Sequence, residues 1–225
     1  MADAAYFEII RKTGGKEKLY IPGYDFNTGF DYEYGKLIWS ERKDHLRWEK
    51  ADKSVLVVYD GKLKNRSKIK HENSLFGPAF SENGKRIVAV ETDDVGNNYL
   101  LIINTENKRV EQRISAKENE FILSPKWDGN KTIVYVSLDK QGKQLVELDL
   151  ASGNKTSLFK SGSMDISQLE VGEGFLFFTA NFSGIDNIFT YLKSYGKVYQ
   201  VTSCLFYTSP SPRDSCIHLV CSLLV

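Results

Sequence analysis

Residues 86–103 read RIVAVETDDVGNNYLLII and hold the pattern that decides the fold. Two nearly continuous apolar runs, at 86–90 and 99–103, flank a polar loop that contains Gly96. Runs of this length, bounded by turn residues, predict strands that are buried on both faces. A similar run recurs at 36–39, 132–136 and 175–178, with steps of 49, 46 and 43 residues between successive runs. A period of about 40–50 residues built only from strands is typical of β-propeller blades.

Each repeat can be divided into four strands, called a to d. In the repeat around 86–103, strand a contains 79–80, strand b 87–90, strand c 99–103 and strand d 109–114. Strand d alternates polar and apolar residues, as expected of an outer edge that must avoid pairing with other chains. The turn between strands a and b contains Gly84, which can take a positive φ. The sequence therefore predicts an all-β propeller of about four four-stranded blades plus a half blade, in an incomplete ring.

The repeat also predicts the organisation of the chain. Residues 1–22 are expected to be the outer half of a truncated blade, because they supply only two strands before the first full repeat. Four blades follow, at 23–71, 72–115, 116–160 and 161–203. Because the blade that begins at 1–22 lacks half of its strands and a propeller must close its ring, we expect both ends of the chain to be cut.

The last segment, 204–225, differs from the rest. It holds all three cysteines, Cys204, Cys216 and Cys221, and also His218. A Cys/His cluster can bind zinc, but the usual C-x₂₋₄-C pair is missing. The stretches 204–214 and 219–224 resemble the translation of a tagmentation sequencing adapter and of the primer sequence that follows it. We therefore interpret this tail as non-native, which leaves the preceding residues without cysteine.

One repeat also carries a family resemblance. Residues 76–88, FGPAFSENGKRIV, resemble the "P-x-F-S-P-D-G-K-x-I" repeat of bacterial TolB-like, WD40-like propellers, with Glu82 and Asn83 where the family has Pro-Asp. Residues 125–133 look like a shortened second copy, and 183–203 also look like this group. The resemblance covers essentially residues 5–203.

This resemblance implies a fold more strongly than a function. Family members include periplasmic cell-envelope proteins that bind partners, and propeller domains attached to serine peptidases. The first group implies a non-catalytic scaffold for protein or ligand binding, part of a longer cell-envelope protein. The alternative is the propeller domain of a larger peptidase, prolyl-oligopeptidase-like or linked to a metallopeptidase, which gates peptide substrates.

Composition and charge argue against nucleic-acid-binding proteins and against proteins with a membrane-spanning helix. The 225 residues carry 30 basic and 29 acidic side chains, a net charge of +1, so we expect no capture of nucleic acid by charge. No segment approaches the roughly 20 apolar residues of a membrane-spanning helix. The first residues, MADAAY, lack the basic and apolar regions of a signal peptide, so the compartment stays open between the periplasm suggested by the resemblance and others.

The candidate binding site lies in the first b–c loop, 40–53, which is about twice as long as the other three. Long loops on a rigid scaffold concentrate binding residues. The side chains best suited to anchor a protein or peptide partner across this loop face are those of Arg42, Asp44, Arg47 and Trp48. An alternative reading is that Trp48 only caps the blade core while the charges are solvated.

Other chemistry finds little support in the sequence. Asp93 and its polar neighbours have oxygen ligands that suit calcium, but without EF-hand spacing a plain polar turn is favoured. His71 is expected to be a surface residue. The sequence lacks G-x-S-x-G, H-E-x-x-H, a Gly-rich phosphate loop and CxxC. We therefore predict no catalytic residues, no metal and no cofactor.

Overall fold

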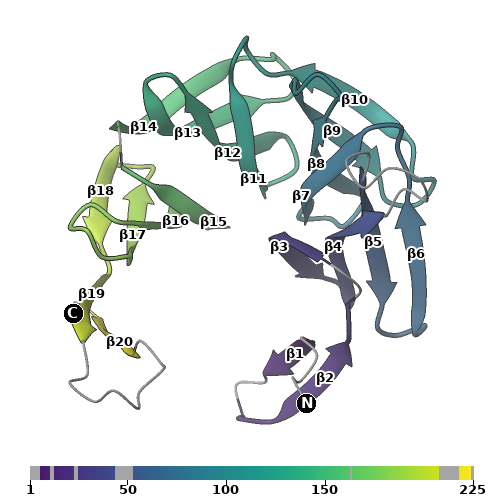
Figure 1. Cartoon of the computed structure of the whole chain (residues 1–225), viewed down its shortest axis with the longest axis horizontal. Helices are drawn as coiled ribbons and strands as arrows, with labels where there is room; N and C mark the ends of the chain where they lie inside the picture. Colours follow the sequence, from purple (N-terminus) through teal and green to yellow (C-terminus); the bar gives the residue numbers. More distant parts are fainter. Residues whose placement is uncertain are drawn as a thin grey trace. The chain divides into compact units, whose positions relative to one another are not determined.

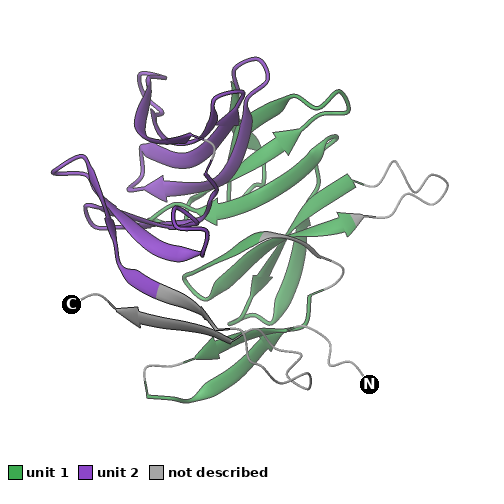
Figure 2. Cartoon of the chain, turned by 60° about the vertical axis from the view of Figure 1, so that its left-hand side comes forward, with its two compact units in different colours: residues 1–115 green, residues 116–225 purple. Residues whose placement is uncertain are grey.

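A computed structural model describes residues 6–10, 13–22, 25–43, 53–162, 164–207 and 218–223, and it confirms the all-β class (Figure 1). The described residues contain no helix, and so none long and apolar enough to cross a membrane. The chain divides into two compact units, residues 1–115 and 116–225, which are described separately (Figure 2).

Unit 1 contains a two-stranded sheet and two four-stranded antiparallel blades. The two-stranded sheet pairs β1 (Phe7–Ile10) with β2 (Lys16–Tyr20). The first blade consists of β3 (Asp25–Glu33), β4 (Lys36–Lys43), β5 (Lys53–Asp60) and β6 (Asn65–Ile69). The second blade consists of β7 (Ser74–Phe80), β8 (Arg86–Thr92), β9 (Asn98–Asn104) and β10 (Val110–Ser115).

Unit 2 contains two further four-stranded blades and a terminal hairpin. The third blade consists of β11 (Phe121–Asp128), β12 (Thr132–Asp139), β13 (Gly142–Asp149) and β14 (Lys155–Gly162). The fourth blade consists of β15 (Ile166–Gly172), β16 (Phe175–Ala180), β17 (Asn187–Leu192) and β18 (Lys197–Gln200). The hairpin pairs β19 (Thr202–Tyr207) with β20 (His218–Leu223).

The central strands follow the apolar runs of the sequence. In β8, Ile87, Val88, Ala89 and Val90 are all buried, and the corresponding run of β12 is buried in the same way. Side chains of successive strand residues point to opposite faces, so a continuous buried run requires cover on both faces. The predicted double-sided burial is therefore confirmed for these strands, whereas β10, at the edge of its blade, is mostly exposed as predicted.

Each unit has an apolar core where its two blades pack face to face. In unit 1, Ile38 and Leu56 of the first blade meet Phe80, Ile87 and further apolar residues of the second. In unit 2, the core between the third and fourth blades contains ten buried residues: Val134, Val136, Leu145, Ile166, Leu169, Leu176, Phe178, Ala180, Phe189 and Tyr191. Burial of such side chains is worth about 1.5–3 kcal/mol each and holds neighbouring blades together.

The first strand of the second blade is longer than the sequence suggested, because a bulge interrupts its pattern, and the first strands of the third and fourth blades contain the same kind of bulge. The registers of β7, β11 and β15 shift beside Gly77, Ser124 and Gln168, which have φ values of 53°, 46° and 50°. An extra residue in one strand breaks the period-two alternation, so strand a is visible in the sequence only beyond the bulge. The expected strand segment 79–80 is the end of β7.

The same contact joins successive blades in both units. The Ser54 hydroxyl, at the start of the third strand of the first blade, donates to the Leu75 carbonyl of the second blade. At the equivalent position of unit 2, the Lys143 Nζ donates to the Ile166 carbonyl at 2.9 Å. Both contacts lie at the b–c end of a blade. In each unit they join this end of one blade to the first strand of the next blade.

Candidate functional site

The strands that flank the predicted loop 40–53 reach further into it than the sequence suggested. Strand β4 continues to Lys43 and β5 begins at Lys53, and residues 44–52 lie outside the described part of the chain. Arg42 therefore lies in a strand, where it pairs with Ser54, and not in a loop. The residues at these two strand ends are polar, so the sequence pattern did not indicate that the pairing of β4 with β5 continues there. Three of the predicted site residues, Asp44, Arg47 and Trp48, lie outside the described residues, so their binding role stays a prediction.

Two buried carboxylates lie at this b–c end in unit 1. Glu41 and Glu91 are the sixth residues of β4 and β8, and their exposed fractions are 3% and 0%. A buried carboxylate is costly unless it is paired and hydrogen-bonded. The sequence pattern placed Glu41 among the polar residues of the expected loop 40–53 and gave no role to Glu91, although a glutamate at the same position of two strands b was a visible signal.

Glu91 is held by three neighbours. Its Oε2 accepts a hydrogen bond from Arg113 Nε at 2.7 Å, and its Oε1 accepts one from Asn73 Nδ2 at 2.6 Å. The Nδ1 atom of His71 lies 3.5 Å from Oε1. Burial alone would raise the pKa of Glu91, but the hydrogen bonds from Arg113 and Asn73 and the nearby positive charge outweigh burial, so its pKa lies below the ordinary value.

Arg113 connects this carboxylate to the outer edge of the blade. It lies on β10, and its guanidinium carbon is 3.4 Å from the centre of the Tyr99 ring on β9, an arrangement typical of cation–π stacking. The hydrogen bond to Glu91 raises the pKa of Arg113. The pair therefore crosses strand c and ties strand d to strand b.

Glu41 has an equivalent set of partners in the first blade. It accepts a hydrogen bond from Arg66 of β6, and the Nζ atom of Lys68 on the same strand lies 3.5 Å away. The indole Nε1 of Trp39 donates to Glu41 at 3.2 Å. In both blades, basic residues of the exposed edge strand thus reach back to a buried carboxylate of strand b.

His71, which the sequence places at the surface, is only partly exposed. Its side chain is about one-fifth exposed and lies beside Glu91 of β8, as does that of Asn73 from the same β6–β7 connection. The sequence around His71 is polar on both sides and contains no signal of this contact. Lys53, on the neighbouring strand, donates to the Glu72 carbonyl of the same connection at 2.5 Å and lies 3.4 Å from Asp94.

The acidic b–c loop of the second blade is a polar turn, as predicted. The Asp93 carboxylate accepts hydrogen bonds from the backbone N–H groups of Val95 and Asn97 at 3.1 and 2.8 Å, and from the Asn97 side chain at 2.9 Å. These bonds, the Asn97 side chain first, lower the pKa of Asp93. Within the described part of the chain, no group of three or more His, Cys, Asp or Glu residues is placed to hold a metal.

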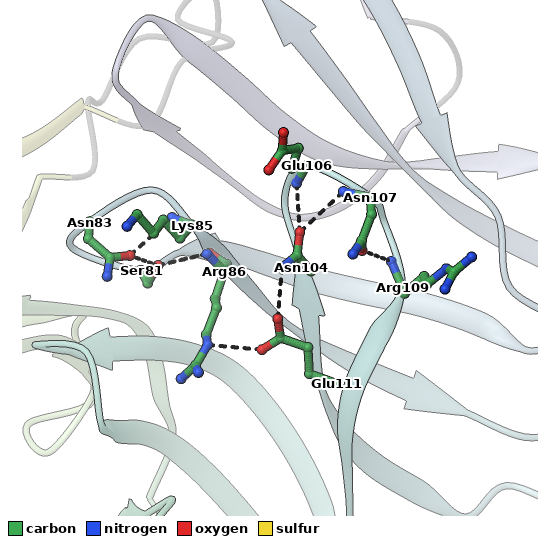
Figure 3. Close-up of polar contacts among 9 residues, drawn as sticks. All are labelled: Ser81, Asn83, Lys85, Arg86, Asn104, Glu106, Asn107, Arg109 and Glu111. Carbon is green, nitrogen blue, oxygen red and sulfur yellow. Dashed lines mark hydrogen bonds and ion pairs between the residues drawn. The ribbon is translucent and has the colours of Figure 1, made fainter.

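The opposite end of the blade carries the residues of the family-like repeat (Figure 3). The Ser81 hydroxyl accepts a hydrogen bond from the Arg86 N–H at 3.0 Å, and the Asn83 side chain accepts one from the Lys85 N–H, also at 3.0 Å. Arg86 Nε lies 3.0 Å from Glu111. These contacts close the a–b turn, so we interpret the repeat motif as a structural element.

Chemically, the b–c end of unit 1 is a platform of paired charges. Each carboxylate described above has a cationic or amide partner, and His71 is the one histidine whose side chain the structure describes. No serine or threonine hydroxyl within that described part bonds to His71 in the manner of a nucleophile and its base. The arrangement can position loops and present charged groups to a partner.

Comparisons with known proteins define the fold. No protein-family model and no curated protein sequence matches the chain. TolB from Acinetobacter baumannii is similar in structure, with a TM-score of 0.62 and 12% identity over 84% of this chain and 50% of that chain. The β-propeller domain of the trilobed protease from Pyrococcus furiosus gives a TM-score of 0.55 and 12% identity, over 88% of this chain and 67% of that chain.

An oligogalacturonate lyase in complex with manganese gives a TM-score of 0.59 and 16% identity, over 84% of this chain and 57% of that chain. The chain thus spans half the length of the TolB chain. At these identities the similarity shows the fold alone, and it confirms the predicted β-propeller class with TolB among its structural neighbours. Proteins with this fold have different functions, so function must be argued from the site.

Proposed function

We propose that this chain is a non-catalytic β-propeller scaffold that binds a protein or peptide through the b–c end of unit 1. The observation that carries the proposal is the pair of buried carboxylates, Glu41 and Glu91, each connected to basic residues of its own edge strand. Such networks rigidify the structure around them when they are fully satisfied.

Rigidity at this end supports binding by the adjoining loop. Segment 44–52 starts three residues after Glu41, and its other end is anchored by Lys53 and Ser54, whose side chains bond to the carbonyl groups of Glu72 and Leu75. A binding segment whose flanking residues are held in place loses less conformational entropy on binding. We therefore expect Asp44, Arg47 and Trp48, together with Arg42 at the end of β4, to form the contact surface.

The test is quantitative affinity purification from the native cells, with mass spectrometry as the readout. The triple variant Asp44→Ala, Arg47→Ala, Trp48→Ala is compared with a matched control at the opposite end, Lys85→Ala, Glu106→Ala, Arg109→Ala. The three control side chains are exposed, so the control removes as many surface groups without touching the platform. Circular dichroism verifies that both variants fold.

We expect the loop variant to lose its partners at least tenfold and the control to retain them. Equal recovery by both variants would show that the loop is not the binding surface. The peptidase alternative predicts a different outcome: the parent protein would contain a catalytic domain with a G-x-S-x-G or H-E-x-x-H motif, which sequencing of the flanking DNA reveals.

A further inference from the structure

The a–b turn of the second blade contains the one Asn-Gly pair in the sequence, Asn83–Gly84. Because glycine has no side chain, its backbone can approach neighbouring groups closely. Attack of the Gly84 nitrogen on Cγ of Asn83 forms a C–N bond, closes a succinimide ring and releases the side-chain amide as ammonia. Water then opens the ring to give aspartate or isoaspartate. This deamidation therefore needs no co-reactant other than water.

In the folded protein the turn holds both reacting groups in other contacts. The Gly84 N–H donates to the Ser81 carbonyl at 2.7 Å, so the attacking nitrogen is already hydrogen-bonded. The Asn83 Oδ1 accepts hydrogen bonds from the Ser81 hydroxyl at 2.9 Å and from the Lys85 N–H at 3.0 Å (Figure 3). Rotation of the Asn83 side chain toward Gly84 would break these bonds, so the reaction requires the turn to open.

A tyrosine of the neighbouring blade packs on this turn. Tyr34 lies between β3 and β4, in the a–b turn of the first blade, and its hydroxyl donates to the Glu82 carbonyl. Its ring lies so close to Gly84 that an added Cβ there would be 2.7 Å from it. Tyr34 has a φ of 54°, which is unusual for a bulky residue and persists only where surrounding contacts hold it. The two contacts therefore join the a–b turns of the first and second blades.

We propose that Asn83 is a deamidation site whose reactivity is controlled by Tyr34. While the two turns stay in contact, the Asn83–Gly84 pair remains intact. When they separate, the Gly84 nitrogen and the Asn83 side chain become free to react, so a transient opening leaves a permanent chemical change. The site lies at the opposite end of the blade from Glu91, and the inference goes beyond the proposed binding role without depending on it.

Peptide mapping by mass spectrometry measures the conversion of Asn83 while the full chain is incubated at mildly alkaline pH. The same chain unfolded in guanidinium chloride gives the rate without protection by the turn. We expect conversion in the folded chain to be at least tenfold slower, because the hydrogen bonds of Asn83 and Gly84 must break first.

Two variants test the control by Tyr34. Tyr34→Phe removes the hydrogen bond to Glu82 and keeps the ring on Gly84, whereas Tyr34→Ala removes both contacts. We expect conversion of Asn83 to be at least threefold faster in Tyr34→Phe and at least tenfold faster in Tyr34→Ala. The matched control is Tyr195→Ala, which removes an exposed tyrosine from a turn of unit 2, and we expect a change below twofold. Circular dichroism verifies that all three variants fold.

A further variant separates local opening of the turn from loss of stability. Glu91→Gln breaks a buried ion pair at the other end of the same blade and leaves the contacts of Tyr34 in place. We expect it to change the conversion rate less than threefold.

Three results would overturn the proposal. One is equal conversion in the folded and unfolded chains, which shows that the turn does not protect Asn83. Another is a rate in Tyr34→Ala no higher than in Tyr195→Ala. The last is an equal acceleration by Glu91→Gln and Tyr34→Ala, which shows that Asn83 reacts only after the whole unit unfolds.

Discussion

Substitution of Glu91 by glutamine removes the charge at the centre of the unit 1 platform while keeping its volume. Glutamine can still accept one hydrogen bond through its carbonyl, but its NH₂ group must then face a donor, either Arg113 or Asn73. The lost charge-assisted bond is worth about 1.5–3 kcal/mol. Because Arg113 is 45% exposed and water can rehydrate it, we expect the lower half of this range, about 2 kcal/mol.

Urea unfolding followed by circular dichroism measures this loss at pH 7. For a chain of this size, about 2 kcal/mol corresponds to a melting temperature lower by roughly 4–8 °C. The control is Glu111→Gln, because Glu111 forms an ion pair with Arg86 in which both side chains are at least one-third exposed. We expect the control to lose at most about 0.5 kcal/mol.

The pH dependence of the difference gives an independent check. The pKa of Glu91 is lowered by folding, so its contribution to stability is complete above the ordinary glutamate value of 4.5 and is lost as the pH falls through the folded value. The gap between wild type and Glu91→Gln should therefore be constant near neutrality and shrink below pH 4.5. If Glu91→Gln costs no more than Glu111→Gln at pH 7, the network does not stabilise unit 1.

Three further outcomes are expected. Gly84→Ala should cost about 1–3 kcal/mol in urea unfolding, since Gly84 has a φ of 65° and an added Cβ would lie 2.7 Å from the Tyr34 ring; an unchanged midpoint would contradict this. Lys193→Met should cost about 1–2 kcal/mol, and less in 1 M NaCl, because the hydrogen bonds that raise the Lys193 pKa despite burial come from two carboxylates that would then repel each other. Removal of 204–225, which we interpret as non-native, should leave the melting temperature unchanged because Thr202 keeps its bond to blade four; a drop of several degrees would show that the tail packs as native structure.

The sequence predicted the fold because packing dictates its pattern. A strand buried on both faces must be apolar at every position, so the run at 86–90 and its repeats were readable without a structure. The first strands of the blades could not be read from the sequence, because the bulges at Gly77 and Ser124 break the alternation of polar and apolar residues. Long-range contacts were also invisible: nothing near His71 in the sequence indicates that Glu91, twenty residues later, faces it.

The sixth position of strand b differs from the apolar positions that precede it. The buried apolar positions repeat from blade to blade, but this position changes from glutamate at 41 and 91 to Ser137 and Ala180. In the third blade a carboxylate still lies beside it, because Glu120 accepts a hydrogen bond from the Ser137 hydroxyl at 2.7 Å.

In the third blade the carboxylate is that of Glu120, which comes from the segment before β11 and not from strand b. Lys155 of strand d lies 3.8 Å from Glu120. A buried charge at the b–c end of a blade is thus retained by different residues when the strand position changes. Packing alone does not require a charge at this place, since Ala180 of the fourth blade is buried without one. Under the proposed function the charged b–c ends hold the adjoining segments in place, so segment 44–52, which follows Glu41 in the chain, is the first surface to test.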